Sequence, residues 1–153
     1  MKIRRVSLLS LLFVVFFSIA ASAQSAVKWR TTVKMTSETE GVLSVKAIIA
    51  EPWHLYGTKL PENGPRPTVL DFSASKGVKF TGAFTPSVKP TTKMDPLFDM
   101  KISYWTGTVV FTREFKLTGK KSDALLSGKL TYMVCDDNNC QPPKTDTVAL
   151  RIK

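Results

Sequence analysis

The stretch VKWRTTVKM, from Val27 to Met35, alternates apolar or small residues with polar ones at every second position. Successive side chains of an extended strand point to opposite faces, so a period of two places one set of residues on a buried face and the other in solvent. Val27, Trp29, Thr31, Val33 and Met35 form the first set, and Lys28, Arg30, Thr32 and Lys34 form the second. The stretch therefore predicts a half-buried β-strand.

The same period continues along the chain, and a helical period of 3.6 is almost absent. SETEG has the composition of a turn, and Val42 to Ala50 repeats the alternation with Leu43, Val45, Ala47 and Ile49 in register. Gly, Pro and Asn clusters separate five further candidate strands: Thr68 to Phe72, Val78 to Phe84, Thr108 to Leu117, Gly128 to Cys135 and Thr145 to Ile152. Seven short strands of this kind predict an all-β fold, an immunoglobulin-like antiparallel β-sandwich.

The first residues have the layout of an export signal. Lys2, Arg4 and Arg5 precede an apolar run from Val6 to Ala20, and Ala21-Ser22-Ala23 follows. This order of charged, apolar and small residues predicts a cleavable signal peptide over residues 1–23, with an uncleaved anchor as the alternative. Residues 24–153 are then one domain, because no linker divides them. Export to the periplasm would place the cysteines where disulfides persist.

The chain is basic, with a formal net charge of +10. Removal of Lys2, Arg4 and Arg5 with the signal leaves +7. The remaining lysines are spread along the strands, which favours a solvated face, and an exported chain is not expected to bind nucleic acid. An acidic protein surface or an anionic lipid surface remains open as a partner.

The two cysteines of the chain, Cys135 and Cys140, lie in YMVCDDNNCQPPKT, from Tyr132 to Thr145. If the strands on either side of this stretch are neighbours, Asp136 to Asn139 form the tip of their connection, and a disulfide across it is geometrically allowed. Such a small ring stabilises a fold by only about 2 kcal/mol, against about 4.7 kcal/mol for a loop of a hundred residues. The spacing therefore favours a pair kept for its chemistry over a structural staple.

Other uses of the pair have less support in the sequence. A zinc site needs four ligands, and the chain offers one pair of cysteines, the single histidine His54 and two adjacent carboxylates. A copper(I) site that joins the cysteines to Met94, Met100 or Met133 remains open, as does an inert disulfide in a non-catalytic immunoglobulin-like binding domain. A cysteine nucleophile would need a neighbouring base, and the sequence does not place His54 beside either thiol.

Three segments resemble the N-terminal domain of DsbD, the thiol:disulfide interchange protein of the bacterial periplasm. They are WHLYGTKLPENGPRPT from Trp53, MDPLFDMKISYWTG from Met94, and YMVCDDNNCQPP from Tyr132. The resemblance covers the chain from Val27 to the last predicted strand. It implies an immunoglobulin-like fold and a redox relay of the protein-disulfide reductase type, linked to cytochrome c biogenesis. Such a relay works by thiol-disulfide exchange through a mixed disulfide, with no cofactor, bound metal or small-molecule substrate.

The resemblance also implies roles for particular residues. Cys135 and Cys140 match the redox pair, with Cys140 as the sulfur that forms the mixed disulfide and Cys135 as its resolving partner. Phe98 matches the aromatic residue of a cap loop over the disulfide. His54 and Tyr56 match positions that line the active site. The partners would be thioredoxin-like periplasmic proteins, one donor and one acceptor. Because the sequence ends at Lys153, we expect a stand-alone domain that receives electrons from a separate protein, either directly or through a separate membrane conductor.

Asp136 and Asp137 directly follow Cys135 and allow two interpretations. Their negative charge disfavours a thiolate at Cys135, which suits a relay that reacts inside a docked complex. They are equally suited to forming the turn.

Overall fold

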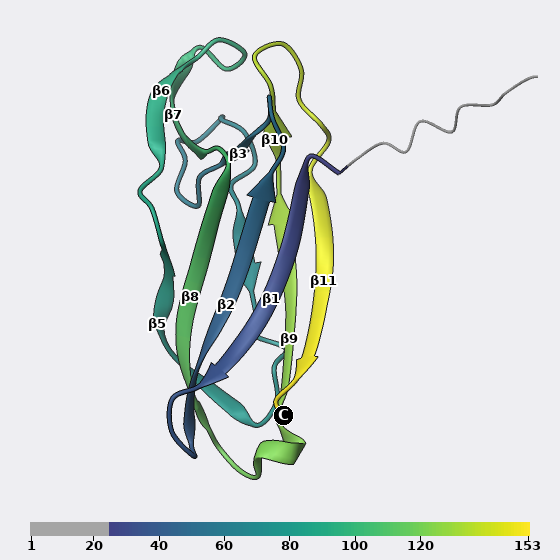
Figure 1. The fold of residues 1–153 in the computed structure, drawn as a ribbon. Helices are drawn as coiled ribbons and strands as arrows, with labels where there is room; N and C mark the ends of the chain where they lie inside the picture. The colour runs from purple at the N-terminus through teal and green to yellow at the C-terminus, as the bar shows by residue number, and fades with distance from the viewer. Residues whose placement is uncertain (1–24) are drawn as a thin grey trace, which may run out of the picture.

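The computed structural model describes residues 25–153, and the predicted signal peptide over residues 1–23 lies outside them (Figure 1). No helix within the described range is long and apolar enough to cross a membrane. A single short 3-10 helix, Lys121–Asp123, is found there beside eleven strands: β1 (Val27–Met35), β2 (Glu40–Ile49), β3 (His54–Tyr56), β4 (Val69–Asp71), β5 (Val78–Pro86), β6 (Thr91–Asp95), β7 (Met100–Trp105), β8 (Thr108–Leu117), β9 (Leu125–Tyr132), β10 (Val134–Cys135) and β11 (Lys144–Arg151).

The strands pack as an antiparallel sandwich of the immunoglobulin-like type, as the sequence predicts. One layer is the sheet β1-β2-β8-β5, which lies at the front in Figure 1. The other layer contains the sheet β11-β9-β4 and, at the upper end in Figure 1, the sheet β10-β3-β7-β6. Residues 125–135 link the two parts of this layer, because β10 follows β9 after the single residue Met133.

The main core lies between the layers. The apolar positions of β2 predicted from the alternation are buried there: Leu43, Val45 and Ala47 are fully buried and Ile49 is 4% exposed. Leu126 and Leu130 of β9 and Phe111 and Phe115 of β8 belong to the same core cluster. Burial of this much apolar surface is the main force that holds the layers together.

All seven predicted strands are present, two of them with the predicted bounds, Val27–Met35 and Thr108–Leu117. The prediction missed β3, β6 and β7. β3 has three residues, too few to show a period, and the first four residues of β6 are all exposed. These strands form a small sheet that is specified by packing around the disulfide more than by alternation.

The sheet β10-β3-β7-β6 has two different faces. Leu55, Trp105 and Val134 point from it into the main core. Tyr56, Ile102 and Cys135 point the other way and form a second buried cluster. We call this second surface the disulfide face. It places the cysteine pair on the outside of the sandwich rather than in its core.

Candidate functional site

Cys135 and Cys140 form a disulfide and lie directly opposite each other in an antiparallel bridge, with Cα atoms 4.0 Å apart. The flanking backbone bonds run from Asp136 N–H to the Asn139 carbonyl and from Gln141 N–H to the Val134 carbonyl, both at 2.9 Å. The cysteines therefore occupy a non-hydrogen-bonded pair, the position in an antiparallel ladder where opposed residues come closest. The local strand pairing itself brings the two sulfurs together.

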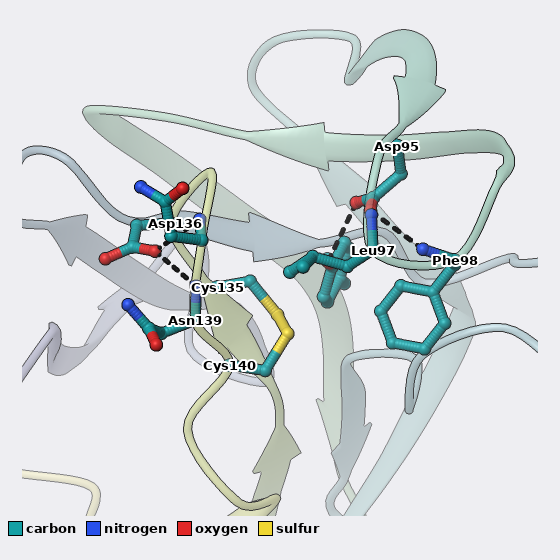
Figure 2. Close-up of a disulfide and its surroundings, with 9 residues drawn as sticks. Asp95, Leu97, Phe98, Cys135, Asp136, Asn139 and Cys140 are labelled. Carbon is teal, nitrogen blue, oxygen red and sulfur yellow. Dashed lines mark hydrogen bonds between the residues drawn. A yellow bond between two sulfur atoms is a disulfide. The ribbon is translucent and has the colours of Figure 1, made fainter.

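Asp136 organises the hairpin tip between the cysteines. Its Oδ1 accepts the backbone N–H of Asn138 at 2.8 Å and of Asn139 at 2.6 Å (Figure 2). These two bonds hold the pKa of Asp136 below its ordinary value, because they stabilise the charged carboxylate. Asp136 thus performs the turn chemistry that the sequence allowed, and it also keeps a negative charge next to Cys135.

Pro142 and Pro143 follow the hairpin at a change of register. Cys140 is opposite Cys135, but Lys144 is opposite Tyr132, so the returning strand holds one extra residue between these pairs. Proline has no N–H to donate, and it is tolerated at such a bulge where it would break a regular ladder. The Pro-Pro pair therefore separates the disulfide hairpin from the regular β9–β11 pairing.

The two cysteines differ in accessibility. Cys135 is 0% exposed, because it lies between β3 on one side and Cys140 on the other. Cys140, on the outer arm of the hairpin, is partly exposed. Only Cys140 therefore offers surface to an approaching molecule.

Residues 96–99 join β6 to β7 on the disulfide face, and Phe98 packs on the cluster that contains Cys135; we call residues 96–99 the cap loop. The loop is a single helical turn that begins at Asp95. The Asp95 Oδ1 accepts the N–H of Leu97 at 2.9 Å and of Phe98 at 3.3 Å, and its carbonyl accepts the N–H of Asp99 at 2.9 Å. Asp is a preferred residue for such a cap, and proline, here Pro96, suits the first position of a turn. Asp99 closes the turn in the left-handed region, with φ of 50°.

Asp95 also connects the cap loop to β3. Its Oδ2 accepts the Tyr56 hydroxyl at 2.9 Å, and both residues are buried, with Asp95 only 5% exposed. Burial, and then the neighbouring Asp95, raise the pKa of Tyr56 well above its ordinary value. The phenol therefore stays protonated and remains a hydrogen-bond donor.

Phe98 belongs to the disulfide face and not to the main core. It is partly buried and packs on the cluster of Tyr56, Ile102 and Cys135, together with Cys140. Figure 2 shows its ring hanging from the cap loop, with Leu97 between it and the disulfide in this view. Leu97, next to it, is 43% exposed. The aromatic ring and the disulfide therefore share one small cluster.

His54 lies directly opposite Cys135 in the pairing of β3 with β10. Its ring packs against Tyr56 and Tyr104, with centroids 5.3 and 4.7 Å away, and its Nε2 is buried without a hydrogen-bond partner among the described residues. Burial lowers the pKa of His54, against the opposing carboxylates of Asp95, Asp137 and Asp136. The imidazole is therefore neutral at neutral pH.

The five residues named from the sequence, Cys135, Cys140, Phe98, His54 and Tyr56, are thus brought together at one sheet. Sequence reasoning missed Asp95, although the Asp-Pro pair in MDPLFDM was a signal for a capped turn.

Residues 25–153 contain no group of three or more His, Cys, Asp or Glu side chains placed to hold a metal ion. Met100 and Met133 pack near the disulfide, whereas Met94 is 60% exposed.

Comparison with known proteins agrees with this arrangement. The family described as thiol:disulfide interchange protein DsbD, N-terminal, matches residues 22–152. Among solved structures, the chain is similar to the N-terminal periplasmic domain of ScsB from Proteus mirabilis, with a TM-score of 0.61 and 16% identity, covering 84% of this chain and 47% of that one. No curated protein matches the chain. The first match covers nearly all the described residues, and the chain belongs to the family of DsbD N-terminal domains, which are thiol-disulfide interchange domains.

Proposed function

We propose that the domain relays reducing equivalents between thioredoxin-like proteins of the periplasm through Cys135 and Cys140. The observation that carries this proposal is the unequal exposure of the two sulfurs: Cys140 is partly exposed beside the cap loop, and Cys135 is fully buried. A structural disulfide has no need for such an arrangement. In a relay it defines which sulfur meets the partner and which one resolves the intermediate.

The exchange follows from this geometry. A thiolate of the donor dithiol attacks Sγ of Cys140, the Cys135–Cys140 bond breaks, and Cys135 leaves as a thiolate that takes up a proton. The second donor thiol then attacks the donor sulfur of the mixed disulfide and releases Cys140. The donor has become a disulfide and the domain a dithiol, a transfer of two electrons.

Discharge to the acceptor runs through the same sulfur. The Cys140 thiolate attacks the disulfide of the acceptor and forms a mixed disulfide with it. Cys135 then attacks Sγ of Cys140, which restores the internal bond and releases the acceptor as a dithiol. Asp136 keeps negative charge beside Cys135, which disfavours a free thiolate there, so we assign activation of the pair to the docked complex.

The location in the periplasm is part of the proposal. Residues 1–23 have the layout of a signal peptide, family membership points to a periplasmic role, and the similar ScsB domain is periplasmic. An oxidising compartment maintains the disulfide, and a reducing partner is needed to open it.

Single-cysteine variants test the proposal. Cys135→Ser leaves Cys140 without a resolving thiol, so it should accumulate a mixed disulfide with a single-cysteine thioredoxin variant, used as the probe protein and activated as a disulfide with an aromatic thiol that departs on attack. Cys140→Ser leaves only the buried sulfur and should trap far less. Non-reducing gels quantify both adducts, and the Cys135→Ser/Cys140→Ser double variant gives the background. Equal trapping by the two single variants would remove the assignment of Cys140 as the exchanging sulfur.

A further inference from the structure

Asp95 is the point at which three separate hydrogen bonds of the disulfide face meet. One carboxylate oxygen holds the N–H groups of Leu97 and Phe98, and the other holds the Tyr56 hydroxyl at 2.9 Å. The bond from the Tyr56 hydroxyl is buried and Asp95 is 5% exposed, so this bond is shielded from water, while the two bonds that begin the turn are partly buried. Shielding from water strengthens a hydrogen bond to a carboxylate.

A cap of a helical turn requires only one of these oxygens. The Oδ1 already satisfies the two N–H groups that begin the turn, which is all that such a cap supplies. The bond from Tyr56 to Oδ2 adds nothing to the turn itself. It ties the turn to β3, the strand that pairs with the Cys135 segment.

Tyr56 is itself held in place by its backbone. Its N–H donates to the Met133 carbonyl at 3.3 Å, and its carbonyl accepts the Thr68 hydroxyl at 2.6 Å. Met133 lies two residues before Cys135. Backbone hydrogen bonds therefore hold Tyr56 in place on the disulfide face, and the bond from its hydroxyl to Asp95 attaches the cap loop to it.

We propose that Asp95 is a positioning residue that latches the cap loop against the disulfide face through its hydrogen bond with Tyr56. Asp95 is not a catalytic residue; it acts by setting how often Phe98 leaves the cluster of Tyr56, Ile102 and Cys135. The latch sets the rate at which a thiol reaches Cys140, and it leaves the equilibrium between disulfide and dithiol largely to the cysteines. This inference rests on the proposed function, since a latch matters only where the disulfide has to be reached.

Paired variants separate the latch from the turn. Tyr56→Phe removes only the hydroxyl, and Asp95→Ser keeps an oxygen that can cap the turn but is too short to reach Tyr56. Each should raise the rate of reduction by dithiothreitol, below the unfolding range, by about tenfold, the size expected for loss of one buried hydrogen bond to a carboxylate. The Tyr56→Phe/Asp95→Ser double variant should be no faster than the faster single variant, because both remove the same bond. Asp95→Asn, which can still bond to the Tyr56 oxygen as a donor, should restore part of the wild-type rate.

Tyr104→Phe is the matched control, because it removes a hydroxyl on the disulfide face without touching the Asp95 bonds. A second readout does not depend on redox chemistry. Amide hydrogen exchange of Leu97 and Phe98 should quicken in Tyr56→Phe, while exchange in the middle of β2 stays unchanged. If Asp95→Ser does not fold, the reduction rate and the amide exchange of Tyr56→Phe are sufficient to test the proposal.

The outcomes are distinct from those that test the proposed function. Reduction rates and cap-loop exchange in Tyr56→Phe within about twofold of wild type, a difference of about 0.4 kcal/mol, would overturn the latch. So would a rate gain equal to that of Tyr104→Phe. Faster cap-loop exchange together with equal trapping by the single-cysteine variants would uphold the latch and remove the assignment of Cys140 as the exchanging sulfur.

Discussion

The rings of Tyr56 and Phe98 meet edge to face, with centroids 6.0 Å apart and planes at 87°. The edge of one aromatic ring on the face of another is a favourable arrangement. The same tyrosine donates its hydroxyl to Asp95, so it contacts the residue that begins the turn as well as Phe98 within it. Phe98 is therefore oriented by two contacts with one residue of β3, next to the strand that contains Cys135.

Truncation of Phe98 should affect reactivity more than stability. We expect Phe98→Ala to speed reduction by dithiothreitol, because the ring packs beside the disulfide on a surface loop. The free energy of unfolding should fall by clearly less than the ~3 to 5 kcal/mol lost when a core aromatic residue is truncated. The measurement pairs the reduction rate with the urea midpoint. Phe111→Leu, in the main core, is the control that should lose stability without gaining rate. A large loss of stability at an unchanged rate would show that Phe98 is a structural residue.

The reduction potential of the pair should lie clearly above about −300 mV, the value below which structural disulfides lie. The reason is the small hairpin ring, which gives the disulfide little loop-closure stabilisation. Equilibration against glutathione, followed by thiol counting, measures the potential. A double cysteine-to-alanine variant gives the background signal of the thiol assay. A value well below that mark would favour an inert disulfide.

His54 should make stability depend on pH in mildly acid solution. Its pKa is lowered by burial, so below the ordinary value of about 6.5 the unfolded chain binds a proton that the folded chain refuses. The contribution of neutral His54 to the free energy of unfolding is complete above the pKa of the unfolded chain. It is lost as the pH falls from there through the lower pKa of the folded chain. The chain has one histidine, so a single imidazole resonance reports the folded pKa directly. His54→Phe should remove this part of the pH dependence. A titration midpoint at or above 6.5 would contradict the prediction.

Gly128 should not tolerate a side chain. A Cβ at this position would lie 2.7 Å from three atoms of the Phe72 ring, which is itself only 2% exposed. We expect Gly128→Ala to cost about 1–3 kcal/mol, the usual range for overpacking a core. The urea midpoint measures the loss, and Phe72→Leu in the same chain should recover part of it. Gly119→Ala, where a Cβ meets no atom within 4 Å, is the control. An unchanged midpoint in Gly128→Ala would show that the ring moves aside freely.

The sequence predicted the parts of the fold that depend on a repeating period. β2 buries every second residue and β1 partly buries every second residue, so their alternation was visible in Val27–Met35 and in Leu43, Val45 and Ala47. The family resemblance named the residues that the structure brings to the disulfide face. Neither period nor composition could locate β3 or β6, because these short strands follow from contacts between distant segments. Asp95 was missed for the same reason: its bond to Tyr56 spans 39 residues.

The continuity of β9 with β10 divides the disulfide between two regions of unequal local stability. Cys135 ends the segment of β9 and β10, which pairs with β11, β4 and β3, so the opening of its backbone requires these pairings to break. Cys140 is on the outer arm of the hairpin, which the bulge at Pro142-Pro143 separates from β11, and only a few hydrogen bonds hold this arm. Regions with few protected hydrogen bonds open with small free energies. Core strands open only at free energies close to that of unfolding the whole domain. The disulfide thus joins the hairpin arm of Cys140, which opens at a small free energy, to the segment of Cys135, which opens only at a large one. Once that bond is reduced, the hairpin arm is free to fray with Cys140 on it, and Cys135 remains where it was.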